Sequence, residues 1–191
     1  MSISNRKKEI IRIAAKLFKE QGYRAVSMRD LAKALHMKAS SLYNHIQSKE
    51  EILSHIILEV AEEYATSMRQ IQNNDSSCKQ KLKLLIELHI HIANKNSHGM
   101  AIVQKDWIHL KKEMEYYKNL RSEYENSFYE IIKEGIRNAE LKEVNPETIL
   151  FTLLSTLNTL YLWIPKKTEL DIENLKKELP MLLLLGIAKT K

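Results

Sequence analysis

The fold is decided by residues 27–46, SMRDLAKALHMKASSLYNHI, which predict two short helices separated by a turn. Ser27 and Asp30 have the spacing of a capping box, in which two side chains satisfy the first backbone N–H groups of a helix. The turn is expected at residues 36–38, and the second helix at about Ala39–His45. Two short helices joined by a tight turn are typical of a helix-turn-helix.

The second helix of this pair has one apolar side and one polar side. Leu42 and Ile46 lie one helical turn apart, so both can face a core. The major groove of DNA admits a single helix, whose outward side chains read base edges and phosphates. The outward side chains here are small or polar: Lys38, Ser40, Ser41, Tyr43, Asn44 and His45. The pattern therefore predicts a helix that enters duplex DNA.

Further helices are expected on both sides of this motif, and the chain is predicted to be all-α. Only 4 Gly and 3 Pro occur in 191 residues, which favours long helices with short turns. A first helix should span about residues 5–21 and end at Gly22. After the motif, helices are expected over about residues 49–72, 79–94, 100–112, 115–138, 146–163 and 171–188, which makes about nine in total. Pro180 should kink or split the last one.

Positive charge is concentrated in the first quarter of the chain. Residues 1–50 hold 11 Lys and Arg against 4 Asp and Glu, whereas the remaining residues hold 19 against 20. A compact basic unit on a neutral body suits a polyanion such as DNA, and a solvated basic face would have the same composition. The sequence thus predicts a helix-turn-helix domain over residues 1–48 and a second helical domain over residues 49–191.

Cysteine usage and hydropathy predict a cytoplasmic protein without a membrane partner. Cys78 is the only cysteine, which excludes an intrachain disulfide and suits a reducing compartment. The N-terminal residues lack the apolar core of a signal sequence. The longest uninterrupted apolar run, residues 181–185, is too short to span a bilayer.

Residues 10–53 resemble the TetR family of bacterial regulators. The resemblance is carried by three stretches: AAKLFKEQGY at residues 14–23, VSMRDLA at 26–32 and LYNHIQSKE at 42–50. It covers about a quarter of the chain, and the rest matches the family only in its number of helices. The resemblance implies a ligand-responsive transcriptional repressor that binds double-stranded operator DNA as a homodimer.

The resemblance also implies contacts with the DNA backbone. Ser27 and Arg29, at the start of a helix, look like phosphate contacts. Tyr43 and His45 resemble recognition-helix residues that touch the backbone, and Lys49 resembles a lysine that pairs with a phosphate.

Base contacts are implied for Ser40, Ser41 and Asn44. Two positions depart from the family pattern: His36 stands where Gly is usual in the turn, and Lys38 stands where a Ser or Thr cap is usual. A lysine there loses a cap but can pair with a phosphate. Four residues have no evident structural task and carry the strongest expectation of DNA contact: Lys38, Ser41, Asn44 and Lys49.

The implied homodimer has support in the second domain. The helix from Pro146 is apolar on more than one side, and the last helix is also rich in leucine. A surface helix needs only one apolar stripe, so a second stripe indicates a partner subunit or deep burial. Between these two we expect the partner subunit.

A small apolar effector is the remaining implied partner. Six residues could line an aromatic and aliphatic pocket: Trp107, Tyr117, Tyr124, Phe128, Asn158 and Tyr161. Each of them could also belong to the core. Residues 106–107 and 157–163 resemble family members that respond to fatty acyl-CoA thioesters, and multidrug-type or other apolar effectors remain alternatives.

Enzymatic and metal-dependent functions are not expected. His89 and His91 are two residues apart on a helix and point to different faces, so they cannot ligate one ion together. The chain has no glycine-rich phosphate loop and no paired catalytic carboxylates, and we expect no cofactor. One alternative is a DNA-binding factor of the same fold that organises the nucleoid or restrains cell division, and another is an enzyme on a helical scaffold.

Overall fold

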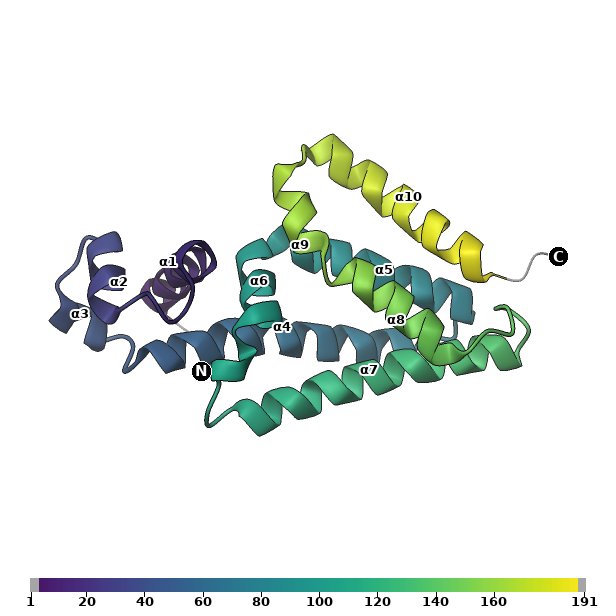
Figure 1. Ribbon diagram of the computed structural model, residues 1–191, viewed down its shortest axis with the longest axis horizontal. Helices are drawn as coiled ribbons and strands as arrows, with labels where there is room; N and C mark the ends of the chain where they lie inside the picture. Colours follow the sequence, from purple (N-terminus) through teal and green to yellow (C-terminus); the bar gives the residue numbers. More distant parts are fainter. Residues whose placement is uncertain (1–3, 189–191) are drawn as a thin grey trace. The chain divides into compact units, whose positions relative to one another are not determined.

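A computed structural model describes residues 4–188, and within that range the protein consists of α-helices and short 3₁₀ helices (Figure 1). Among these residues, β-type pairing is limited to an isolated bridge between Leu141 and Ala188. The expectation of an all-α fold is confirmed. Spatial contacts divide the chain into two compact units, each with its own core. The first unit holds the residues up to Val60 and His98–Tyr117, and the second holds the rest.

The first unit contains the predicted helix-turn-helix. Helix α1 (Asn5–Gln21) has the limits that the sequence predicts and ends at Gly22, whose φ of 88° suits glycine. Helix α2 (Met28–Ala34) starts at a complete capping box, and helix α3 (Ala39–Tyr43) follows after the turn. His36 lies in that turn with a φ of 51°, the left-handed geometry expected where glycine is usual.

The remaining elements of the first unit differ from the prediction in one place. The first part of α4 (Lys49–Gln72) belongs to this unit, as predicted. The single helix expected at residues 100–112 is instead α6 (Ser97–Lys105) followed by the 3₁₀ turn η1 (Trp107–His109). The α-helix ends at Lys105, and the buried Leu110, which is extended, ends the 3₁₀ turn.

The core of the first unit joins α1, α2, α3 and α4. It is formed by apolar side chains that are at most 1% exposed: Ile10, Ala14, Phe18, Leu31, Leu42, Ile46, Ile52 and Leu53. Leu42 and Ile46 are the two that the sequence predicted to face a core. The core therefore fixes which face of each short helix is turned outward.

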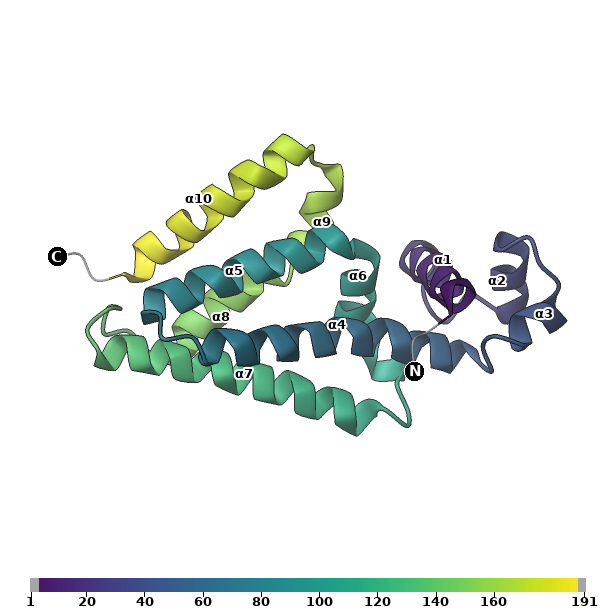
Figure 2. The same cartoon turned by 180° about the vertical axis from the view of Figure 1, so that it is seen from behind.

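The second unit is organised around α5 (Cys78–Lys95). Helices α8 (Pro146–Leu157), α9 (Leu160–Trp163) and α10 (Glu169–Ile187) all contact α5, and α10 runs antiparallel to it (Figures 1 and 2). The larger part of α7 (Met114–Arg137) completes the unit. Its core includes these fully buried side chains: Leu82, Leu85, Ile86, Phe128, Ile132 and Leu157.

Two details of the second unit correct the prediction. The helix expected at residues 146–163 is broken after Leu157, where the hydroxyl groups of Thr156 and Thr159 bond to carbonyls of the preceding turn. Such bonds compete with the helical ladder and promote a bend or an end. Of the kink or split expected at Pro180, the split does not occur: α10 runs through that buried proline.

Candidate nucleic-acid interface

Helix α3 presents a polar face above a buried apolar anchor. Leu42 and Ile46 have no exposed surface, as their one-turn spacing predicted. Seven of the nine residues predicted to contact DNA are exposed: Ser27, Arg29, Lys38, Ser40, Tyr43, Asn44 and His45. Ser41 and Lys49 are half-buried. Within the first unit, the polar face of α3 is therefore exposed and can bind a partner.

Helix α3 is shorter than predicted. It ends at Tyr43, Asn44 is its C-terminal cap, and the N–H of His45 bonds to the carbonyl of Leu42 over 3.0 Å. Three residues further on, Ser48 caps the next helix by accepting a hydrogen bond from the N–H of Glu51. His45 consequently lies beyond the helix rather than inside it.

The polar residues of the motif differ in how far they are already engaged. Ser27 accepts a hydrogen bond from the N–H of Asp30 and donates its hydroxyl to the Asp30 carboxylate, and this bonding lowers the pKa of that carboxyl. Lys38 caps α3 without a side-chain hydrogen bond, as expected. In the described part of the chain, the side chains of Arg29, Lys38 and Asn44 make no hydrogen bond or ion pair. These three are free to bind a ligand.

Lys49 has a structural task, so the premise that it lacks one is wrong. Its ammonium donates hydrogen bonds to backbone carbonyls of the connection between α1 and α2. It also lies 4.4 Å from the ring centroid of Tyr23. Partial burial lowers the pKa of this ammonium. Residue types alone do not reveal these contacts, because every residue carries a backbone carbonyl.

Tyr23 is the aromatic centre of this contact. Its ring packs edge-on against the ring of Phe18, with 5.2 Å between the ring centroids, and stacks on the ring of His109, with 5.4 Å between the centroids. Burial raises the pKa of the Tyr23 hydroxyl, with smaller contributions from Glu50 and Asp106. The connection between α1 and α2 is thus held by side chains from α1, α4 and η1.

The six residues predicted to bind an effector are divided between the two units. Trp107 and Tyr117 lie in the first unit, and Tyr124, Phe128, Asn158 and Tyr161 lie in the second. The rings of Trp107 and Tyr117 are in contact, with 5.8 Å between their centroids, and so are those of Tyr124 and Phe128, with 6.2 Å between theirs. All except the half-buried Trp107 and Asn158 are buried. In the described structure, the buried members contribute to the packing of their own units.

A buried hydrogen-bonded cluster in the second unit was not predicted. His89 lies between two tyrosines, with its Nδ1 3.1 Å from the hydroxyl of Tyr64 and its Nε2 2.9 Å from the hydroxyl of Tyr124. A neutral imidazole has one donor and one acceptor, so one tyrosine donates to the ring and the other accepts from it. This cluster joins α4, α5 and α7 inside an otherwise apolar core.

The members of this cluster are uncharged at neutral pH. Burial lowers the pKa of His89 to about 3 and raises the pKa of Tyr64 and of Tyr124. His91, two residues along α5, is exposed, which confirms that the two histidines face different directions. Sequence reasoning considered His89 only as a metal ligand, because no spacing along the chain links it to tyrosines on two other helices.

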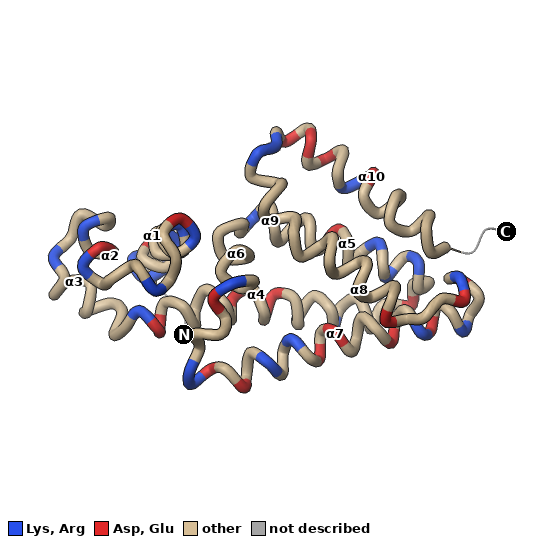
Figure 3. Tube along the Cα trace, viewed as in Figure 1, with Lys and Arg blue, Asp and Glu red and all other residues tan. Residues whose placement is uncertain are grey.

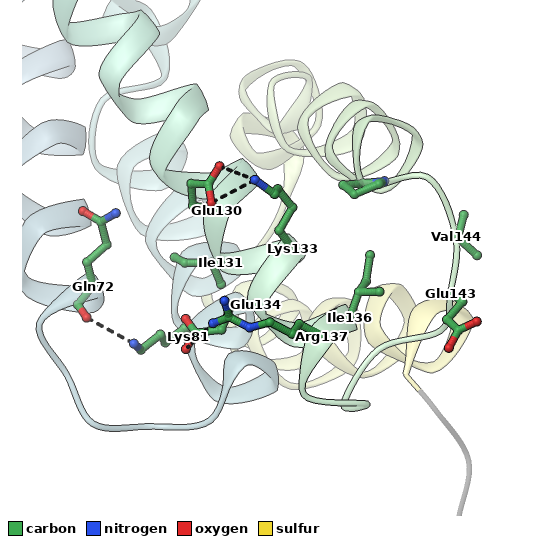
Figure 4. Close-up of a pocket in the computed structure, with 11 residues that line it drawn as sticks. Gln72, Lys81, Glu130, Ile131, Lys133, Glu134, Ile136, Arg137, Glu143 and Val144 are labelled. Atoms are coloured by element: carbon green, nitrogen blue, oxygen red, sulfur yellow. Dashed lines mark hydrogen bonds and ion pairs between the residues drawn. The ribbon is translucent and has the colours of Figure 1, made fainter.

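A cavity of about 640 Å³ opens between the end of α7, α4, α5 and the loop before α8 in the second unit (Figure 4). Its wall is largely charged: Lys81, Glu130, Lys133, Glu134, Arg137 and Glu143. Lys133 pairs with Glu130 at 3.0 Å, and Lys81 donates to the carbonyl of Gln72 at 3.1 Å. None of the six predicted effector residues lines this cavity. It is therefore not the aromatic pocket that the sequence predicts.

Residues Pro146–Lys166 have the length and mean hydropathy, 1.3, of a membrane-spanning segment, although polar residues interrupt the apolar ones. The structure divides this segment into α8, α9 and the 3₁₀ turn η2 (Ile164–Lys166). A membrane-spanning helix needs about 20 residues, and α8 has 12. Only 33% of the apolar window is buried, so its exposed side chains require another explanation.

Sequence profiles of two families match the chain. Residues 10–56 match the profile described as "Bacterial regulatory proteins, tetR family". Residues 75–187 match the profile described as "Tetracyclin repressor-like, C-terminal domain". Together these matches include most of the first unit's helix-turn-helix and most of the second unit.

Whole-length relatives and solved structures are similar to this chain. The transcriptional repressor KstR2 of Rhodococcus jostii is 24% identical over 97% of this chain and 92% of its own. The fatty acid metabolism regulator protein of Bacillus subtilis is 26% identical over 94% of both chains. The structure of the ketosteroid transcriptional regulator KstR2 of Mycobacterium tuberculosis matches with a TM-score of 0.92 at 19% identity. The match covers 99% of this chain and 98% of the KstR2 chain. AibR, solved with isovaleryl coenzyme A and operator DNA, matches with a TM-score of 0.78 at 21% identity. The match covers 92% of this chain and 96% of the AibR chain.

The buried cluster generates a prediction about pH. Folding holds His89 neutral, whereas the unfolded chain protonates this residue below about pH 6.5. Its contribution to the free energy of unfolding is complete above that pH and decreases by about 1.4 kcal/mol per pH unit toward pH 3. Replacing His89 by Leu removes this dependence and the two hydrogen bonds to tyrosine hydroxyls, at a cost of about 1–3 kcal/mol at pH 7.

Urea unfolding of the wild type and His89→Leu between pH 7 and pH 4 checks this prediction. The stability advantage of the wild type should shrink as the pH falls and reverse by pH 4, because protonation of His89 then costs the wild type about 3.4 kcal/mol. His91→Leu, which alters an exposed histidine on the same helix, is the matched control. A difference between wild type and His89→Leu that stays constant over this range would contradict the buried, neutral state of His89.

Proposed function

Because this chain belongs to the TetR family of bacterial regulatory proteins, we propose that it represses transcription as a homodimer on operator DNA and is released by a small apolar effector. Members of the family are DNA-binding transcription factors, and the chain is not an enzyme. The observation that carries the proposal is the exposed polar face of α3 above the buried Leu42 and Ile46.

The DNA contacts that we propose follow from this face. A helix presents side chains to base edges only if its opposite side is fixed, and Leu42 and Ile46 fix α3 to the core of the first unit. Lys38 offers a free ammonium to a phosphate, and Asn44 offers a free amide, which can bond adenine through two hydrogen bonds. Ser40, whose side chain is exposed, is the second residue that we assign to base edges.

The distribution of charge supports the same partner. Lys and Arg recur along α1 and α2, whereas α8 carries neither (Figure 3). Displacement of counterions from DNA by such a basic region makes affinity strongly dependent on salt. We therefore assign DNA binding to residues 1–48 and the remaining functions to residues 49–191, and we place the protein in the cytoplasm with its operator.

Two substitutions on α3 distinguish phosphate contacts from base contacts. Lys38→Ala should weaken binding to every duplex and reduce the slope of log affinity against log salt by about 0.9 for each phosphate that the lysine neutralises. Asn44→Ala should leave that slope unchanged and reduce discrimination at one base pair by about 1–3 kcal/mol. Fluorescence anisotropy on operator fragments found by genomic footprinting measures both quantities.

Lys166→Ala, which removes an exposed lysine outside residues 1–48, is the matched control and should bind like the wild type. If neither α3 variant differs from this control, α3 is not the helix that reads DNA. A wild-type chain without affinity for any duplex would overturn the proposed function as a whole.

A second copy of the chain is the partner that we propose for the exposed apolar side chains of α8 and α10. Phe151 is 72% exposed, Leu182 61% and Leu185 63%, and such a concentration of exposed apolar side chains favours an interface. Only one residue of α8, Glu147, is charged. Two copies also supply the two reading helices that a symmetric operator requires. The same interface accounts for the membrane-like hydropathy of Pro146–Lys166.

Charges introduced at this surface should separate the subunits. The double variant Phe151→Glu, Leu182→Glu is expected to sediment as a monomer where the wild type sediments as a dimer, because buried unpaired carboxylates oppose association. Its operator affinity should fall at least about tenfold, since each half-site is then bound independently.

Ile108→Glu changes an exposed apolar residue in the first unit and should remain dimeric. A wild-type monomer at micromolar concentration, or a double variant that stays dimeric, would contradict this assignment.

The effector that we propose is an acyl-CoA thioester whose acyl chain binds the aromatic residues of the second unit. Tyr124 and Phe128 are in ring contact there, and because both are buried they have to move apart to admit the acyl chain. Support for this ligand class comes from AibR, which was solved with isovaleryl coenzyme A, and from the similarity to a fatty acid metabolism regulator. The two helix-turn-helix domains of a dimer have to be spaced to match the operator. An effector that favours a different spacing of these domains would release the DNA.

Isovaleryl-CoA and a long-chain acyl-CoA test this part of the proposal, with free CoA as the matched ligand control. An effector that binds only the folded protein raises stability by about 2.7 kcal/mol at one hundred times its dissociation constant, and it should also release operator DNA. Phe128→Leu should weaken the response while preserving DNA binding. If neither acyl-CoA raises the melting temperature or releases DNA, the acyl-CoA assignment is wrong.

A further inference from the structure

The ammonium of Lys49 occupies a site built from backbone carbonyls. It donates to the carbonyl oxygens of Tyr23 at 2.8 Å, Arg24 at 3.3 Å and Val26 at 2.8 Å. A lysine ammonium has three N–H donors and no acceptor. All three donors are therefore engaged within the first unit, and a phosphate oxygen could take one only if a carbonyl lost its partner.

The surroundings of Lys49 strengthen this attachment. The ammonium lies over the ring of Tyr23, which Phe18 and His109 hold in place. Lys49 is also the first residue of α4, where the positive end of the helix dipole disfavours a cation. The carbonyls and the aromatic face offset that unfavourable placement, so the lysine is stabilised by its contacts and not by the helix that carries it.

The segment that Lys49 holds leads directly into the motif. Tyr23, Arg24 and Val26 lie between Gly22, which ends α1, and Ser27, which caps α2. Val26 is buried, so the segment is fixed on one side by packing and on the other by the ammonium. The start of α2, including the exposed Arg29, is set by the path of these few residues.

We propose that Lys49 is a positioning residue for DNA binding: its ammonium fixes the connection between α1 and α2 and thereby orients α2 and α3 toward the duplex, without itself binding a phosphate. This inference rests on the proposed DNA binding and changes the role that the family resemblance implies for Lys49. Lys38, whose ammonium has no partner in the described structure, is by contrast a direct phosphate ligand.

Lys49→Met and Lys49→Arg test this inference beside Lys38→Ala. Methionine removes the charge at a similar length, and arginine keeps the charge but replaces the compact ammonium with a planar guanidinium that fits three converging carbonyls poorly. Operator affinity is measured as a function of salt by fluorescence anisotropy, well below each variant's melting temperature. A merely structural role would lower the melting temperature and leave the affinity of the folded protein unchanged.

Both Lys49 variants should bind the operator about tenfold more weakly while the salt slope stays at the wild-type value. Lys38→Ala should lower the slope by about 0.9 for each phosphate that the lysine neutralises. A slope in Lys49→Met that falls as in Lys38→Ala, or a Lys49→Arg variant that binds like the wild type, overturns the inference. If Lys49→Met does not fold, Lys49→Arg decides alone. A wild type that binds no duplex would instead contradict the proposed function.

Discussion

The burial of Leu42 and Ile46 beneath α3 is the constraint on which the interface depends. A helix of five residues is far too short to be stable by itself in water. Forming the first turn loses more backbone conformational entropy than its few hydrogen bonds offset. The core of the first unit therefore holds α3 in shape, and it also decides which side of α3 is exposed. Small or polar side chains on that side are accessible because both apolar side chains are turned inward.

The rest of the first unit supports this arrangement through capping and charge. The capping box at Ser27 starts α2, the left-handed His36 turns the chain, and Lys49 fastens the connection that precedes α2. Each of these devices acts on backbone groups that the short helices would otherwise leave without partners. The side chains of Arg29 and Lys38 are thereby left free for phosphates, in a region whose excess of positive charge favours DNA.

The helix-turn-helix could be predicted from the sequence because local signals specify it. Gly22 and Ser27 mark the end of one helix and the start of the next, and the limits of α1 follow from apolar periodicity. The second unit was less predictable because its decisive contacts join distant segments. No spacing relates His89 to Tyr64 and Tyr124. The same limit applies to Lys49 in the first unit, because the carbonyls that bind it belong to residues of three different types. The break after Leu157 depends on threonine hydroxyls bonding to the backbone, which periodicity does not report.

Methylation protection of a bound operator tests the central claim most directly, because the N7 atom of guanine faces the major groove and the N3 atom of adenine faces the minor groove. If α3 enters the duplex with its polar face, the protein should protect guanine N7 at two positions related by the symmetry of the operator. Protection confined to adenine N3, or a guanine pattern that is the same with and without protein, would contradict the assignment of α3 as the reading helix.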